Sequence, residues 1–264
     1  MTLLLTLLWT FEGGWLVSSL APGPLLGVAT YANCFYLLNW TTGEAVLKRC
    51  PGGQFERSSY AFGKYAFLKD GAVYVTDGKE VKEVKCNCTY ALPLSSGLAE
   101  CWDNGTLTAP GWKANVRCSW LGTNGTALFV VTENSTLIFK MNGTLVSSLP
   151  LGGKEGALCG RLLALAGDGR VVLLNGTRPL WVRKALSPGE LDFSDDCKYL
   201  AYTDIYNGTL TIVDVKSGKV VLEKYFEFSP SCALAVFSVA WKGNIIAVGR
   251  GDGWVYAYRT GWER

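Results

Sequence analysis

Residues 161–184 read RLLALAGDGRVVLLNGTRPLWVRK, and this stretch decides the fold class. Its apolar segments are separated by Asp168-Gly169 and by a turn around Gly176. An Asn-Gly or Asp-Gly pair between apolar runs is a strong β-hairpin signal, because these residues accept the backbone angles of tight turns. The stretch therefore predicts three consecutive antiparallel strands, at 161–166, 170–174 and 177–184.

The same order of strand, turn, strand, glycine turn and strand recurs seven times along the chain. The first turn of each repeat falls at Asn33, Asp70, Asn104, Asn134, Asp168, Asn207 and Asp252. The second turn centres on Gly43, Gly78, Gly111, Gly143, Gly176, Gly218 and Gly261, which are 35, 33, 32, 33, 42 and 43 residues apart. With one further strand at the start of each repeat, seven four-stranded antiparallel units predict an all-β fold, the seven-bladed β-propeller.

Apolar strands are expected before and between the paired turns of each repeat. Those before the first turn span 25–30, 64–68, 97–102, 127–132, 161–166, 198–203 and 244–248. Between the two turns, 105–109 is the weakest copy of the expected strand. Because the repeat covers nearly the whole chain, we expect a single domain, 1–264.

The ends of the chain complement each other. Only three residues follow Gly261, too few for a fourth strand, while the apolar segment 2–11 precedes the first repeat. We expect 2–11 to be the outer strand of the blade that contains 244–248 and 254–258, because closing the ring hides an exposed sheet edge. The apolar start resembles a signal sequence, but the first basic residue is Lys48, which favours a structural role. No apolar run reaches the roughly 18 residues of a spanning helix, so no transmembrane segment is expected.

Three segments resemble the repeats of known propeller families. Residues 193–201, FSDDCKYLA, resemble the FSPDGKYLA segment of WD-repeat and YVTN-type propellers, with Asp195 in place of proline and Cys197 in place of glycine. Residues 36–47 and 212–222 resemble the strand–turn–strand of quinoprotein-like and YVTN-type propellers. The resemblance implies the propeller architecture and leaves the activity open, because propellers host many functions.

Asparagine is concentrated in glycosylation sequons. Eight of eleven Asn lie in N-x-[ST], where chance predicts roughly one or two. The eight are Asn39, Asn87, Asn104, Asn124, Asn134, Asn142, Asn175 and Asn207. Five read Asn-Gly-Thr and are also explained by hairpin turns, but Asn39, Asn87 and Asn134 have other sequences. The pattern predicts a heavily N-glycosylated extracellular protein, with covalent glycans on at least half of these sites.

Nine cysteines fit an oxidising compartment, although buried free thiols remain the alternative. The disulfide candidates are Cys50, Cys86, Cys88, Cys101 and Cys118. We expect at least one bridge within 50–118, between neighbouring blades or from a connection between blades to an adjacent strand. Cys86 and Cys88 are expected to bond elsewhere rather than to each other, and Cys159, Cys197 and Cys232 to lie near innermost strands. The odd count leaves one thiol free or bonded to another chain.

No catalytic motif is present, and histidine is absent, which removes His-dependent nucleophiles and metal sites. The net charge of +3 is spread along the chain, so no nucleic-acid partner is expected. The Arg-Gly-Asp at 250–252 is interpreted as a hairpin turn. We interpret Asp192, Asp195, Asp196 and Asp204 as strand and turn residues rather than a Ca²⁺ site, and we expect no catalytic residue, cofactor or metal.

Three functional hypotheses follow. The first is a non-enzymatic secreted glycoprotein, a structural or binding subunit at the cell surface that contacts protein partners or itself and forms or decorates an extracellular filament. The second is an extracellular propeller enzyme acting on glycans, which needs a carboxylate pair around the central channel. The third is an intracellular WD-type adaptor. The chain has no His, nine Cys and many sequons. In this combination it resembles an extracellular glycoprotein of a hyperthermophilic archaeon.

Overall fold

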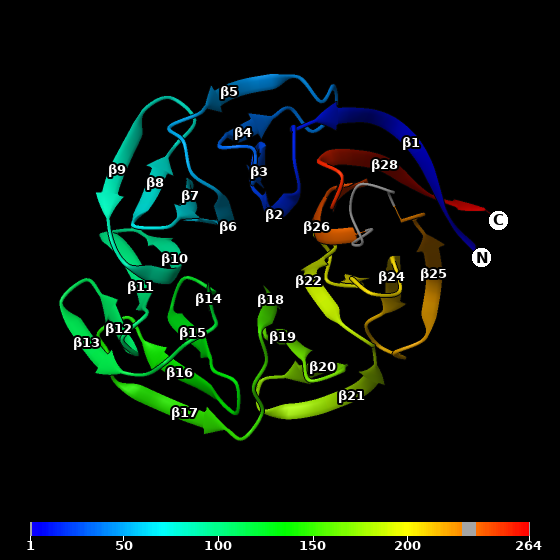
Figure 1. Ribbon diagram of the computed structural model, residues 1–264. Coiled ribbons are helices and arrows are strands. Elements are labelled where there is room, and N and C mark those ends of the chain that lie inside the picture. The colour runs from blue at the N-terminus through cyan, green and yellow to red at the C-terminus, as the bar shows by residue number, and fades with distance from the viewer. Residues whose placement is uncertain (1, 229–235, 264) are drawn as a thin grey trace.

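The computed structural model describes residues 2–228 and 236–263, and these form 28 strands in seven four-stranded antiparallel sheets. The sheets stand side by side in a ring (Figure 1). No helix occurs in the described ranges. The predicted all-β, seven-bladed propeller is confirmed. We number the blades 1 to 7 in chain order, from β2–β5 to the sheet of β26, β27, β28 and β1.

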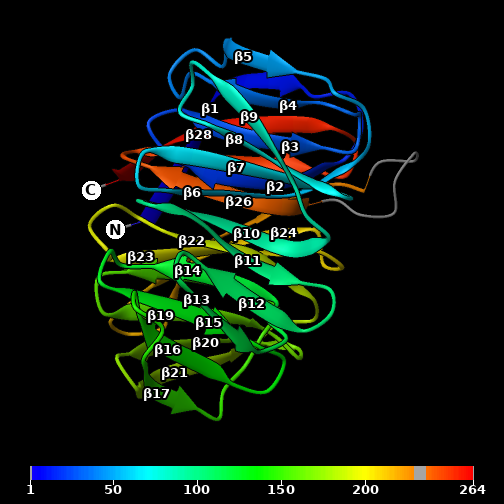
Figure 2. The ribbon, with the colours of Figure 1, turned by 90° about the vertical axis from the view of Figure 1, so that its left-hand side faces the viewer.

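In each blade the four strands are stacked from the centre of the ring to its rim (Figure 1), and each strand runs roughly along the axis of the ring (Figure 2). The innermost strands are β2 (Val17–Pro22), β6 (Phe55–Ala61), β10 (Cys88–Leu94), β14 (Trp120–Thr123), β18 (Glu155–Cys159), β22 (Pro188–Phe193) and β26 (Val236–Lys242). The second strands are β3 (Leu26–Thr30), β7 (Lys64–Lys69), β11 (Gly97–Trp102), β15 (Ala127–Val131), β19 (Leu162–Gly167), β23 (Tyr199–Asp204) and β27 (Ile245–Arg250).

The third and outer strands complete the blades. The third strands are β4 (Phe35–Leu38), β8 (Ala72–Thr76), β12 (Thr106–Ala109), β16 (Thr136–Lys140), β20 (Arg170–Asn175), β24 (Thr209–Asp214) and β28 (Trp254–Glu263). The outer strands are β5 (Ala45–Arg49), β9 (Val81–Lys85), β13 (Trp112–Asn115), β17 (Leu145–Leu149), β21 (Arg178–Lys184), β25 (Val220–Tyr225) and β1 (Thr2–Glu12). Even the weakest predicted copy, 105–109, forms a strand, β12.

Blade 7 is built from both ends of the chain. β1 pairs antiparallel with β28 from Thr2 opposite Glu263 to Glu12 opposite Trp254, so the outer strand comes from the start of the chain and the other three from its end (Figure 1). The expected turn at Gly261 is wrong: Gly261 lies inside β28. The chain stays extended there, because β1 already fills the outer position of this blade.

The hydrophobic core lies between neighbouring blades. Between blades 1 and 2, for example, the rings of Phe35 and Phe67 stack with centroids 4.3 Å apart, and Phe55 packs edge-on against Phe35. All three side chains are fully buried. Each blade thus buries an apolar face against the next, as stacked sheets do, and the ring is stable only when every blade has two neighbours.

A tryptophan–glycine contact joins blades at the rim in three places. In each, a half-buried Trp on an outer strand covers the glycine of the next blade's second turn and donates its indole N–H to a backbone carbonyl of that turn at 2.9 Å. The pairs are Trp9 with Gly43, Trp112 with Gly143, and Trp181 with Gly218. These glycines have φ between 67° and 86°, and a Cβ atom would lie within 3.0 Å of the indole. Glycine is therefore required there by both conformation and space.

Candidate functional site: the central channel

The seven innermost strands enclose a cavity of about 180 Å³ at the centre of the ring. Every one of these strands contributes to its lining, including β6 through Arg57, β10 through Tyr90, β14 through Trp120, β18 through Glu155 and β22 through Glu190. Arg57, Glu155, Glu190 and Asp192 all line this one small space, which makes the cavity the strongest candidate site in the fold.

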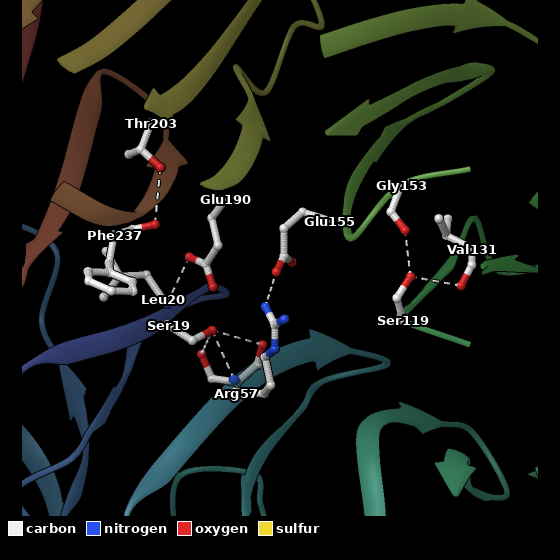
Figure 3. Close-up of polar contacts among 11 residues, drawn as sticks. Ser19, Leu20, Arg57, Ser119, Val131, Gly153, Glu155, Glu190, Thr203 and Phe237 are labelled. Carbon is white, nitrogen blue, oxygen red and sulfur yellow. Dashed lines mark hydrogen bonds and ion pairs between the residues drawn. The ribbon is translucent and has the colours of Figure 1, made fainter. Parts of the chain in front are cut away.

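Arg57 and Glu155 form an ion pair across the channel. Arg57 Nη1 donates to Glu155 Oε1, although the two residues are 98 positions apart and belong to blades 2 and 5 (Figure 3). Only 31% of the Arg57 side chain and 13% of the Glu155 side chain are accessible. The adjacent Glu155 carboxylate holds the pKa of Arg57 above its usual range, against the opposing effect of burial. The pair ties opposite sides of the ring together.

Glu190 lies beside this ion pair, and its carboxyl group holds a proton more tightly than an ordinary glutamate does. Burial, the largest cause, and the negative charge of Glu155 together raise the pKa of Glu190 to about 8, against the opposing effect of hydrogen bonds from Ser19 and Leu20. Glu190 Oε2 accepts a hydrogen bond from the Leu20 backbone N–H at 3.1 Å (Figure 3). The channel therefore combines an ion pair, Arg57 with Glu155, and a carboxyl group, Glu190, that is mostly protonated at neutral pH. Burial also raises the pKa of Tyr90, which stays neutral.

Hydrogen bonds around the channel join adjacent blades. Ser119 donates to the Gly153 carbonyl at 2.7 Å, and Thr203 donates to the Phe237 carbonyl at 3.0 Å (Figure 3). Asp192 accepts from the Trp241 backbone N–H at 2.6 Å, and burial raises its pKa to about 7. These contacts satisfy buried polar groups and fix the distance between neighbouring blades.

The channel brings together the two kinds of carboxyl group that a glycosidase needs, one protonated and one ionised. Sequence reasoning singled out no such pair, and Glu155 and Glu190 were not among the candidates. Their only sequence signal was a charged residue in the first strand of a blade, the strand whose position the turns mark least clearly. The geometry is unfavourable for hydrolysis, because Arg57 engages Glu155 and the cavity is smaller than the roughly 300–1,000 Å³ of typical ligand sites.

The acidic residues considered for Ca²⁺ are engaged with other groups. Asp195 pairs with Lys242 at 3.5 Å, Asp196 with Lys198 at 2.8 Å, and Asp204 accepts the backbone N–H of Leu186 at 2.6 Å. Within the described ranges no group of three or more His, Cys, Asp or Glu residues could hold a metal ion.

The Arg-Gly-Asp segment is a closed hairpin turn between β27 and β28. Arg250 pairs with Asp252 at 2.8 Å, and their side chains are only 13% and 17% exposed. The expectation of a turn is confirmed.

The sequon asparagines lie in turns or at strand ends, and seven of the eight are exposed, Asn39 being half-buried. Because neighbouring strands are antiparallel, alternate turns reach opposite ends of the ring. One end carries Asn39, Asn124, Asn142 and Asn175. The other carries Asn87, Asn104, Asn134 and Asn207. Their geometry permits modification on both faces, and glycosylation stays a prediction.

Eight of the nine cysteines form four disulfides. The pairs are Cys34–Cys50, Cys86–Cys88, Cys101–Cys118 and Cys159–Cys197. The expected bridge within 50–118 is present as Cys101–Cys118, which ties β11 to the connection after β13. Cys232 lies outside the described residues.

The structure corrects two expectations about the cysteines: the partners of Cys86 and Cys88, and the set of cysteines that form bridges. Cys86 and Cys88 bond to each other, because the chain bends at Asn87 and brings their Cα atoms to 5.4 Å, within disulfide reach. Cys34, Cys159 and Cys197 were not among the candidates. The bridge that joins neighbouring blades is Cys159–Cys197, between the turns that connect the innermost and second strands of blades 5 and 6. Sequence spacing did not reveal this contact, which depends on how the blades pack.

Comparisons with known proteins support the fold and no more. No protein-family model matches the chain, and no curated protein is similar to it. Among solved structures, BamB from Moraxella catarrhalis is similar over 97% of this chain and 100% of that chain, with a TM-score of 0.65 and 12% identity. In all, 1435 solved chains match. A fold shared so widely does not select a function, nor does it separate the WD-repeat from the YVTN type. In the described part of the chain, no helix has the length and hydropathy to cross a bilayer.

Proposed function

We propose that this chain is a non-enzymatic, N-glycosylated β-propeller that works in an oxidising extracellular compartment and binds protein partners as a structural or binding subunit at the cell surface. The observation that carries the proposal is the exposure of seven of the eight sequon asparagines, divided between the two ends of the ring. Glycans on both ends would leave the rim of the blades as the surface for protein contacts. Contact through the rim is compatible with a subunit that forms or decorates a filament, including one of a hyperthermophilic archaeon.

The central channel supports the non-enzymatic part of the proposal. Its ion pair joins blades 2 and 5, and its polar groups are engaged with the walls of the cavity. Ser58, for example, donates its backbone N–H to Ser19 Oγ at 2.9 Å and links blades 1 and 2. Such contacts give the channel a structural role, because they hold strands from distant parts of the sequence in place.

The four disulfides support an oxidising extracellular compartment. Cytosolic thiols are kept reduced outside hyperthermophiles, so in other organisms eight paired cysteines weigh against the intracellular adaptor. Two of the bridges close loops of similar length, with separations of 16 and 17 residues. Each is expected to stabilise the fold by about 3 kcal/mol in the chain-entropy view.

The test is intact mass measurement and peptide mapping of the protein from its native source without reduction. The expected result is glycan on at least four sequons and no more than one free thiol, since four bridges use eight of nine cysteines. Bare sequons together with nine free thiols would overturn the proposal and favour the intracellular adaptor.

Glu155 and Glu190 favour a second candidate, an extracellular enzyme that acts on glycans. In this candidate Glu190 is the proton donor, because its pKa is raised to about 8, and Glu155 is the ionised partner. Incubation with a panel of polysaccharides decides between the two. Hydrolysis that is lost in both Glu155→Gln and Glu190→Gln, while Asp103→Asn remains active, would establish the enzyme; no hydrolysis by the native protein would eliminate it.

A further inference from the structure

The outer strand of blade 7 differs from the other outer strands. β1 has 11 residues, and its outer edge has no strand partner within residues 2–228 and 236–263. Between residues 2 and 11 it contains no charged side chain. Leu4 and Leu7 are 41% and 51% exposed. A long, uncharged edge with free backbone N–H and C=O groups is a template for pairing with another strand.

The other outer strands are protected from such pairing. Each is four to seven residues long, and all but β17 carry charge, as in VKEVK of β9 and RPLWVRK of β21. β21 also contains Pro179, which offers no N–H. The uncharged β17 has five residues and follows the sequon at Asn142. β1 lacks charge, proline and short length, three of the usual means of blocking an edge, although it has a bulge between Leu7 and Trp9.

The other strands of blade 7 offer no attachment site for glycans near β1. Residues 2–12 and 236–263, which form blade 7, contain no sequon. Trp262, on the neighbouring strand β28, is 39% exposed. The seventh-blade rim, defined by Leu4, Leu7 and the free edge of β1, therefore carries no charge on residues 2–11 and no attachment site for glycans, with exposed Arg259 of β28 opposite Thr6.

We propose that the seventh-blade rims of two copies of this chain pair with each other, β1 antiparallel to β1 across a two-fold axis near Leu7. The two four-stranded blades then become one eight-stranded sheet, held by backbone hydrogen bonds and by leucine contacts. This proposal rests on the proposed function, since it names a second copy as the partner that the rim binds.

The charge pattern of β1 favours a second copy of this chain as the partner of its free edge. In an antiparallel pair centred on Leu7, residues 3 to 11 of one copy face residues 11 to 3 of the other, and no charge opposes a like charge. The same pairing of β9 centred on Glu83 would place Glu83 opposite itself. For β21 centred on Trp181, Arg178 would face Lys184. Like charges directly opposite each other destabilise a strand pair. Of these three strands, β1 alone pairs with itself about its centre without opposing like charges.

Sedimentation velocity of the full-length, unglycosylated recombinant protein at micromolar concentration tests the proposal. The wild type is expected to sediment as a dimer, and Leu7→Lys to raise the dissociation constant by about tenfold or more, because two lysines face each other. Val182→Lys is the matched control: Val182 is 59% exposed on β21, so the variant should dimerise like the wild type. A monomeric wild type, or equal weakening by both substitutions, would overturn the proposal.

A charge-swap mixture excludes misfolding as the cause. Leu7→Lys and Leu7→Glu should each sediment as a monomer with a wild-type circular dichroism spectrum. Mixed in equal amounts, they should form the heterodimer, which native mass spectrometry identifies. If the mixture stays monomeric, the β1–β1 contact is wrong. Because this protein carries no glycan, failure here leaves the glycosylation and disulfide results of the proposed function unaffected, so the two can fail separately.

Discussion

The seventh-blade rim and the central channel reverse the usual placement of charge. The rim faces solvent, yet residues 2–11 carry no charge and Leu4 and Leu7 are exposed. The channel is walled by the innermost strands, yet its lining includes Arg57, Glu155 and Glu190. Exposed apolar residues on a free strand edge are a liability in a monomer, whereas buried charges must be paired or protonated. The rim is therefore suited to intermolecular contact, and the channel to fixing strands that are distant in sequence.

The two regions also differ in how they hold the ring. The rim closes it from outside, since β1 supplies the strand that blade 7 lacks and places Trp9 over Gly43 of blade 1. The channel braces it from inside through contacts between nonadjacent blades, such as Arg57 with Glu155. Mutations in each region show which contribution is larger.

Deletion of residues 1–12 should have the largest effect. Without β1, β28 becomes an exposed edge and blades 6 and 1 lose contacts with the seventh. We expect loss of cooperative unfolding, that is, of a stability on the order of 5–15 kcal/mol. Thermal unfolding followed by circular dichroism measures it. A truncated protein that melted like the wild type would show that the channel alone holds the ring; recovery on adding a peptide of residues 1–12 would assign the loss to β1.

Breaking the channel ion pair should have the second largest effect on stability. Arg57→Met leaves the Glu155 carboxylate without its partner in a confined space, and we expect a loss of about 2–4 kcal/mol in unfolding free energy. The double variant Arg57→Met with Glu155→Leu removes both charges and should recover most of that loss. Urea denaturation checks both. If the single and double variants were equally unstable, the pair would not act as a unit.

The tryptophan contact allows blade 7 to be compared with an ordinary blade. Trp9→Ala and Trp181→Ala each remove a half-buried indole and its hydrogen bond from equivalent positions. We expect each to lower the unfolding free energy by about 2–3 kcal/mol. Calorimetry of the two variants measures this. A much larger loss for Trp9→Ala would indicate that ring closure depends on that contact more than on β1–β28 pairing.

The pH dependence of stability isolates Glu190. Its pKa is raised in the folded chain to about 8 from 4.5, so its contribution to stability is complete below pH 4.5 and is lost as the pH rises towards 8. Glu190→Gln keeps an acceptor for the Leu20 N–H and cannot ionise. We expect the stability of this variant relative to the wild type to rise by about 2 kcal/mol between pH 5 and pH 6.5. Parallel melting curves at the two pH values check this, and an unchanged difference would contradict it.

The sequence predicted the turns more successfully than the channel. Six of the seven second-turn glycines have positive φ, because the short-range chemistry of a turn is encoded in a few adjacent residues. Gly261 is the exception, since a distant strand, β1, occupies the position into which the chain would have turned. The pair Arg57–Glu155 and the bridge Cys159–Cys197 depend on register and blade packing across tens of residues. No local pattern records those distances.

The pairing of β1 with β28 also determines how the molecule responds to tension. Thr2 faces Glu263, so residues 2 and 263 leave the pair at the same end (Figure 1). A pulling force applied at these two residues would load the inter-strand hydrogen bonds one after another, as in unzipping, rather than all together, as in shear. Anything tethered through these residues would therefore open blade 7 first and at low force, while the six continuous blades remained unloaded.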